Sequence, residues 1–157
     1  MRKKQFEVTD LDQILQILDR CDVCRIALNE GDYPYIVPMN FGYSCQDGQI
    51  ALYFHSANLG KKIEMLRKNG KVGFELDTSH RVVFADNPCD FAMEFESIIG
   101  TGEIRFLENE EKPFAFTCLM KQYDKEKEYT HFDPKMVEIT AVMKLTVKEL
   151  YCKRIKK

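Results

Sequence analysis

The spacing of apolar residues near the N-terminus predicts a short amphipathic helix over residues 10–20. Four apolar residues recur at helical spacing and would share one face, namely Leu11, Ile14, Leu15 and Leu18. Asp10 is an N-cap candidate, and Gln13 stands where its side chain can return the hydrogen bond of a capping box. We therefore expect the domain to open with a helix that buries one face.

A strand pattern then replaces the helical one. Strand-like runs cover residues 23–28, 33–43 and 49–54, and the turn sequences Asn29–Asp32 and Cys45–Gly48 separate them. These runs predict a meander of three antiparallel strands. Pro34 and Pro38 interrupt the second run, and because proline has no N–H to donate to a sheet ladder, both indicate a sheet edge or a bulge.

A second amphipathic helix is predicted over residues 58–69. Leu59, Ile63 and Leu66 would lie on its apolar face, and the pair Asn69–Gly70 is typical of a helix C-terminus. The lysines of this segment would lie on the opposite, solvated face.

The rest of the chain predicts more strands and one more helix. Strands are expected over 72–77, 94–107 and 139–151, a helix from Asn109 to Tyr123 with Asn109 as its N-cap, and a loop over 124–130. Gly100 and Gly102 indicate a bend or the close approach of a ligand. Residues 81–90 give no clear signal.

Short turns between neighbouring strands decide the fold class. Strands joined by turns such as Asn29–Asp32 run in opposite directions, which excludes a doubly wound parallel sheet. The prediction is a mainly β fold, an antiparallel barrel with peripheral helices. Residues 1–157 are expected to form a single domain, because this length suits one core.

The charge composition limits the classes of partner that the protein is expected to bind. The 23 basic and 25 acidic residues are mixed along the chain and give a net charge of -2, so no broad surface for nucleic acid or membranes is expected. The basic run 153–157 is interpreted as a solvated end. Without a membrane-spanning run or an apolar secretory signal, a cytoplasmic protein with reduced cysteines is expected.

Isolated cysteines and histidines predict no metal site. Cys21 and Cys24 form a CxxC pair, but no second pair or nearby histidine completes a ligand set, so structural thiols are favoured over metal or redox chemistry. His80 and His131 stand in loop-like stretches without partners, and we expect both at the surface.

The segment 54–63 combines the features of an anion site. It places a strand end, the Ser56 hydroxyl, Gly60 and the charges of Lys61 and Lys62 at the start of a helix, where free N–H groups and the helix dipole attract negative charge. On composition alone, an ordinary capped helix with solvated lysines explains the segment equally well.

Five ordered segments carry a family resemblance: Tyr33–Tyr43, Leu52–Ala57, Gly60–Ile63, Asn69–Asp77 and Ser97–Gly102. Together they resemble the 5-nitroimidazole-resistance family, within the pyridoxamine 5'-phosphate oxidase-like flavoproteins. The resemblance implies an antiparallel split β-barrel homodimer that holds FMN at its interface, with FAD left open as the alternative. It also implies a flavin-dependent oxidoreductase that reduces nitroaromatic or related small electrophilic substrates.

Carried over position by position, the resemblance assigns the cofactor contacts to two segments. The flavin ring would run along Val37, Pro38, Met39, Asn40 and Phe41, with backbone groups of the middle three facing its polar edge. The ribityl phosphate would meet His55, Ser56, Ala57, Lys61 and Lys62. The wider superfamily often has an arginine where this chain has Lys61, so the charge is kept while the bidentate fork is lost.

His55 is the candidate catalytic residue. Its near-neutral pKa would suit proton donation to a substrate reduced at a flavin, but it could instead only hydrogen-bond the phosphate or a neighbouring carbonyl. The alternative function is a noncatalytic flavin- or haem-binding protein for storage or sensing. Pyridoxamine 5'-phosphate oxidase activity itself is less favoured, because the basic C-terminal segment of that enzyme is not recognisable in residues 150–154.

Overall fold

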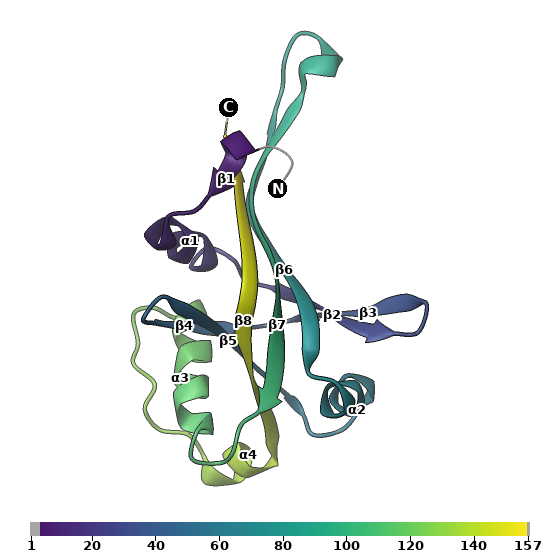
Figure 1. Cartoon of the computed structure of the whole chain (residues 1–157). Helices are drawn as coiled ribbons and strands as arrows, with labels where there is room; N and C mark the ends of the chain where they lie inside the picture. The colour runs from purple at the N-terminus through teal and green to yellow at the C-terminus, as the bar shows by residue number, and fades with distance from the viewer. Residues whose placement is uncertain (1–3, 157) are drawn as a thin grey trace.

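A single antiparallel sheet dominates the computed structural model, which describes residues 4–156 (Figure 1). Its strands are β1 (Glu7–Val8), β2 (Cys24–Glu30), β3 (Tyr33–Met39), β4 (Gly42–Gln46), β5 (Gln49–Ala57), β6 (Lys71–Val83), β7 (Ala92–Phe106) and β8 (Thr140–Ile155). Their order in the sheet is β3-β2-β6-β7-β8-β5-β4, and β1 pairs with β8. The predicted mainly β, antiparallel fold is confirmed.

The described helices are α1 (Leu11–Leu18), α2 (Lys61–Lys68), α3 (Lys112–Tyr123) and α4 (Pro134–Ile139), with short 3-10 turns at Lys4–Phe6 and Pro88–Asp90. Asp10 caps α1 as predicted, because its carboxylate accepts the N–H of Gln13 at 3.0 Å. The side chain of Gln13 does not return this bond. It instead accepts a hydrogen bond from Arg154 at 2.8 Å and so joins α1 to β8.

β3 and β4 lie at opposite ends of the sheet order, although only Asn40 and Phe41 separate them in the chain. The two predicted hairpins, β2–β3 and β4–β5, are present. The predicted three-strand meander is wrong, because its middle run 33–43 is broken at Asn40 and Phe41 into β3, which pairs with β2, and β4, which pairs with β5 at the other end of the sheet order. Within the described chain β3 pairs with β2 alone, so it has the open edge that Pro34 and Pro38 indicate.

β5 is buried on both faces, since hydrophobic clusters lie on either side of it. Leu52 and Phe54 belong to the main core, which also contains the apolar face of α1. Ala51 and Tyr53 point the other way and pack in a second cluster with Leu119 of α3. The two clusters hold β5 in place immediately before residues 55–57 of the candidate anion site.

α2 begins later than the sequence pattern indicates. Ile63 and Leu66 are buried as predicted, but Leu59 precedes the helix and its exposed fraction is 84%, so it does not belong to the apolar face. The reason is that β5 continues to Ala57, which leaves residues 58–60 as the link between the strand and the helix.

The other helical boundaries also differ from expectation. α3 begins at Lys112 rather than after Asn109, because the N–H of Glu111 donates to the carbonyl of Glu108 at 3.0 Å and residues 108–111 form a turn. α4 was not predicted. Its local signal is Asp133 followed by proline, and the Asp133 carboxylate accepts the N–H of Lys135 at 2.9 Å.

β6 and β7 extend beyond the rest of the sheet as a long hairpin (Figure 1). β6 continues to Val83 after a register shift between Thr78 and Arg81, so the first residues of the segment 81–90 are strand and the rest form the hairpin tip. Near the tip, the rings of Phe84 and Phe91 meet edge to face with centroids 5.3 Å apart.

β8 includes most of the basic run that was interpreted as a solvated end. Lys153, Arg154 and Ile155 pair with β7, so that interpretation is wrong for these residues. Arg154 also donates a hydrogen bond to Glu96 at 2.5 Å. Lys157 lies outside the described residues.

Candidate functional site

The end of β5 carries the first part of the candidate phosphate segment. Residues 55–57 pair with residues 140–142 of β8, three positions beyond the strand end expected from the sequence. Phe54 is fully buried, whereas His55 is exposed, because His55 follows Ala51 and Tyr53 on the other face of the strand and lies past the cluster that buries those two side chains. The strand therefore presents His55 outside the core and Ser56 close to the start of α2.

The first turn of α2 carries the second part of the candidate phosphate segment. Gly60 is the N-cap at φ 116°, a backbone conformation that favours glycine, and no side chain caps the helix. Lys61 and Lys62 occupy the first two helical positions. Uncapped N–H groups, the positive end of the helix dipole and an ammonium group are together suited to an anion.

The two lysines have different partners. Lys61 forms an ion pair with Glu30 at 2.7 Å, and its ammonium lies 4.6 Å from the ring centroid of Tyr35. It therefore links α2 to the β2–β3 hairpin. Lys62 is half-buried and forms no ion pair with any residue in the range 4–156, which leaves its charge for a bound anion.

His55 is electrically coupled to this lysine. Burial by the surrounding protein lowers the pKa of His55 below its ordinary value of 6.5, and the positive charge of Lys62 lowers it further. The imidazole consequently gives up its proton more readily than that of an ordinary histidine. An anion that neutralises Lys62 would remove the second cause and bring the pKa of His55 back toward 6.5.

The open edge of β3 carries the candidate ring contacts. Because proline has no N–H to donate, Pro34 and Pro38 are placed with their backbones facing away from β2, so the carbonyl of Pro38 faces the open side. The side chains of Met39 and Phe41 are buried in the core, and only their backbones could contact a ligand. The side chain of Val37 is half-buried against the same core.

Tyr123 fixes the link between β3 and β4 and was not recognised in the sequence. Its hydroxyl accepts hydrogen bonds from the N–H of Phe41 at 3.0 Å and from Nδ2 of Asn40 at 3.2 Å, and it donates to the carbonyl of Asp22 at 2.8 Å. The Phe41 N–H is thus already used within the chain. No local signal reveals these contacts, because Tyr123 lies more than eighty positions away.

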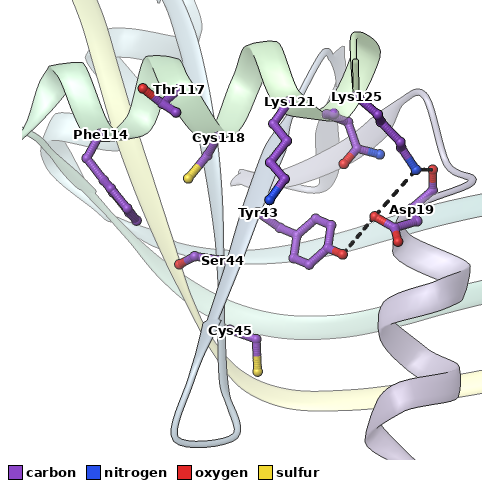
Figure 2. A pocket seen from close by; sticks show the side chains of 10 residues that line it. Asp19, Tyr43, Ser44, Cys45, Phe114, Thr117, Cys118, Lys121 and Lys125 are labelled. Carbon is purple, nitrogen blue, oxygen red and sulfur yellow. Dashed lines mark hydrogen bonds and ion pairs between the residues drawn. The ribbon is translucent and has the colours of Figure 1, made fainter. Parts of the chain in front are cut away.

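A groove of about 520 Å³ between α3 and β4 adjoins this link (Figure 2). The hydroxyl of Tyr43 donates to Asp19 at 2.8 Å, and Lys121 extends from α3 toward β4. Burial raises the pKa of the Cys118 thiol to about 11, so this thiol stays protonated at neutral pH. The sequence did not predict the groove, which depends on the packing of α3 against β4.

The remaining chemistry-bearing residues lie away from this region. Cys21 and Cys24 are buried, and burial raises the pKa of both thiols, which makes them unreactive. His80 is exposed and 2.9 Å from Asp77, and His131 is also exposed. Over residues 4–156, no cluster of His, Cys, Asp and Glu is arranged to hold a metal ion.

The helices of this described range are all too short or too polar to cross a membrane.

Comparison with known proteins identifies the family. Residues 10–154 match the family model described as pyridoxamine 5'-phosphate oxidase. A solved structure of a candidate 5-nitroimidazole antibiotic resistance protein from Bacteroides thetaiotaomicron is 30% identical, with a TM-score of 0.76 over 96% of this chain and 90% of that chain. No curated protein matches the chain.

Two further solved structures share the fold. A FAD and haem binding protein from Mycobacterium smegmatis is 16% identical, with a TM-score of 0.79 over 96% of this chain and 74% of that chain. A flavocytochrome from Azotobacter vinelandii is 18% identical, with a TM-score of 0.77 over 100% of this chain and 72% of that chain. The predicted split β-barrel and the family resemblance are confirmed, and the chain belongs to the pyridoxamine 5'-phosphate oxidase-like flavin-binding family.

Proposed function

We propose that this chain binds FMN, with the phosphate at the first turn of α2 and the ring along β3, and acts as a flavin-dependent oxidoreductase on small electrophilic substrates such as nitroaromatics. The observation that carries this proposal is the uncapped start of α2, where the unpaired Lys62 stands beside the end of β5. The 30% identity to a candidate 5-nitroimidazole resistance protein supports the substrate class.

The residues present match the chemistry of FMN at its phosphate and at its ring. Lys62, the Ser56 hydroxyl and the free N–H groups of α2 match the charge and acceptors of a phosphate. The carbonyl on the open edge of β3 at Pro38 matches a ring N–H donor. Lys61 joins the two ends through Glu30 and Tyr35, so its assigned role becomes positioning the site rather than holding phosphate directly.

A second copy of the chain would complete the site. Tyr33, Ile36 and Leu59 are large apolar side chains exposed on β3 and just before α2, next to the residues assigned to the cofactor. Exposed apolar groups gathered at a site are typical of a surface that another chain covers. We therefore extend the proposal to a homodimer with the flavin at its interface.

The chain's own residues would bind, orient and supply protons. When bound, the flavin supplies the two-electron redox chemistry. Lys62 would neutralise the phosphate, and this would remove the smaller of the two causes that lower the pKa of His55, so that His55 holds a proton more readily than in the cofactor-free protein. His55 is exposed on the strand that leads into the phosphate site, so its imidazole can deliver that proton to a substrate as it is reduced.

The deciding experiment is a visible spectrum of the purified protein, followed by FMN titration of cofactor-free protein and mass analysis of the released cofactor. The proposal predicts a yellow protein that a reductant bleaches and that a nitroimidazole reoxidises. A bleached protein that no nitroaromatic reoxidises would favour noncatalytic flavin binding, and a Soret band would favour haem. A colourless protein that fails to bind added FMN would overturn the proposal.

A further inference from the structure

A buried carboxylate organises two arginines on the side of the sheet where the long hairpin departs. The side chain of Glu96 on β7 has an exposed fraction of only 2%. Arg20 donates to Oε2 of Glu96 through Nε at 3.0 Å and Nη2 at 2.6 Å, and Arg154 donates to Oε1 through Nε at 2.5 Å. Ser79 completes the set at 3.0 Å from Oε2.

The electrostatics show that Glu96 is held as an anion. Burial alone would raise the pKa of this carboxyl, but the hydrogen bonds from Arg20, Arg154 and Ser79 outweigh burial and hold the pKa below its ordinary value. One negative charge therefore faces two guanidinium groups. Two guanidinium groups around one carboxylate leave the cluster with one excess positive charge. An ion pair that only stabilised the fold would not need this excess.

This excess charge faces a cleft of about 630 Å³. Arg20, Arg81, Arg154 and Lys156 line it, against the two carboxylates of Glu94 and Glu96. Nη1 of Arg20 and Nη2 of Arg154 make no hydrogen bond to any residue in the described part of the chain. Because Glu96 already fixes both arginines, their side chains would lose little further entropy when they bind an anion.

We propose that this cleft is a second ligand site, which binds a small phosphate monoester with its phosphate between Arg20 and Arg154. Guanidinium N–H groups in fixed orientation match the oxygens of a phosphate, and Lys156 at the rim adds charge. The side chains of Phe95 and Ile155 alternate to the opposite face of the sheet from Glu96 and Arg154, so the cleft offers charged groups to the phosphate and leaves the organic part of the ligand in solvent. The site is separate from the flavin site, and it does not depend on the proposed oxidoreductase activity.

The test follows the arginine Nε–H signals by NMR during titration with inorganic phosphate and then with phenyl phosphate. We use Lys62→Ala protein, so that the proposed flavin-phosphate site does not contribute. The signals of Arg20 and Arg154 should shift and saturate with both probes, and phenyl phosphate should bind about as tightly as inorganic phosphate, because the arginines contact only the phosphate group. Lys156→Gln, an exposed change, should weaken binding by about fivefold, and Lys148→Gln on β8 should have no effect.

Four results would overturn the proposal. The first is that neither arginine signal moves with phosphate. The second is that chloride at matched ionic strength produces the same shifts, which would mean an adventitious ion only. The third is that phenyl phosphate fails to compete with phosphate. The fourth is that the Lys156→Gln and Lys148→Gln variants bind phosphate equally well. Arg20→Gln should abolish the Arg154 shift, provided that the far-ultraviolet circular dichroism shows a folded protein.

Discussion

The charge of Lys62 lowers the pKa of His55, so the first turn of α2 and the end of β5 act as one electrostatic unit. The same lysine has no ion-pair partner in the described chain, in contrast to Lys61, which is paired with Glu30. A bound phosphate would therefore affect both Lys62 directly and the protonation of His55 through it. This coupling can be measured independently of turnover.

Lys62→Ala should weaken FMN binding by about tenfold or more, because it removes a charge-assisted contact to the phosphate. Titration of the cofactor-free protein, followed by quenching of flavin fluorescence, measures this change. Lys68→Ala is the matched control, since Lys68 lies in the last turn of the same helix and is exposed. Equal affinities for the two variants would remove Lys62 from the phosphate site.

The pKa of His55 gives a pH dependence with a definite sign. Because this pKa is lower in the folded protein than the ordinary 6.5, the unfolded chain binds more protons as the pH falls through 6.5. The free energy of unfolding should therefore decrease as the pH falls from 6.5 toward the folded pKa. Above pH 6.5 this contribution should be constant.

Chemical denaturation at pH 7.5 and pH 5.5 checks this dependence. His55→Gln should flatten it, while His131→Gln, at an exposed loop position, should not. In a histidine NMR titration, Lys62→Ala should raise the pKa of His55. An unchanged pKa would show that burial alone accounts for the shift.

His55→Gln also separates catalysis from cofactor binding. If His55 donates the proton, kcat for nitroaromatic reduction should fall by about 100-fold, as expected for loss of a general acid, while FMN affinity stays within a factor of about two. Stopped-flow reoxidation of the reduced protein gives the rate. Parallel losses of rate and affinity would identify His55 as a cofactor ligand only.

Tyr123→Phe should loosen the link between β3 and β4, because the hydroxyl joins Asn40, Phe41 and Asp22. Leaving these groups without a partner should cost about 1–3 kcal/mol of unfolding free energy and weaken FMN binding at the ring end. Urea denaturation and flavin titration measure the two effects. Tyr151→Phe removes an exposed hydroxyl on β8 and should change neither quantity.

Gly42→Ala should disrupt the packing of α3 on β4. A Cβ at Gly42 would lie 2.4 Å from the backbone of Cys118, whereas a Cβ at Gly73 would meet nothing closer than 3.8 Å. We expect a loss of about 1–3 kcal/mol or more for Gly42→Ala, and a much smaller change for Gly73→Ala. If both variants have the same thermal unfolding midpoint, the close approach of α3 to β4 is wrong.

Local signals in the sequence are sufficient for the elements but not for their arrangement. The cap at Asp10, the hairpin turns and the prolines of β3 act over a few residues, so they predict α1, two hairpins and an open edge. The β5–β8 pairing cannot be predicted in this way. β5 is buried on both faces, and its continuous apolar run contains no alternation that would reveal its partner.

The candidate site also combines features that are local in the sequence with contacts between distant segments. Residues 54–62 are contiguous, so their chemistry is visible in the sequence, and the family resemblance gives them a ligand. The contacts of Lys61 with Glu30 and of Tyr123 with Phe41 join distant segments, and only the folded chain shows them. The arginine pair on Glu96 is equally nonlocal, since Arg20 and Arg154 lie near opposite ends of the chain.

The two prolines of β3 also bear on whether molecules of this protein associate through their sheet edges. An unpaired strand edge is a template on which strands of other molecules can add, the first step of aggregation. With prolines at positions 34 and 38, two of the N–H groups that an added strand would need are missing from the open edge. The open edge of β3 is therefore a poor template for strands of other molecules.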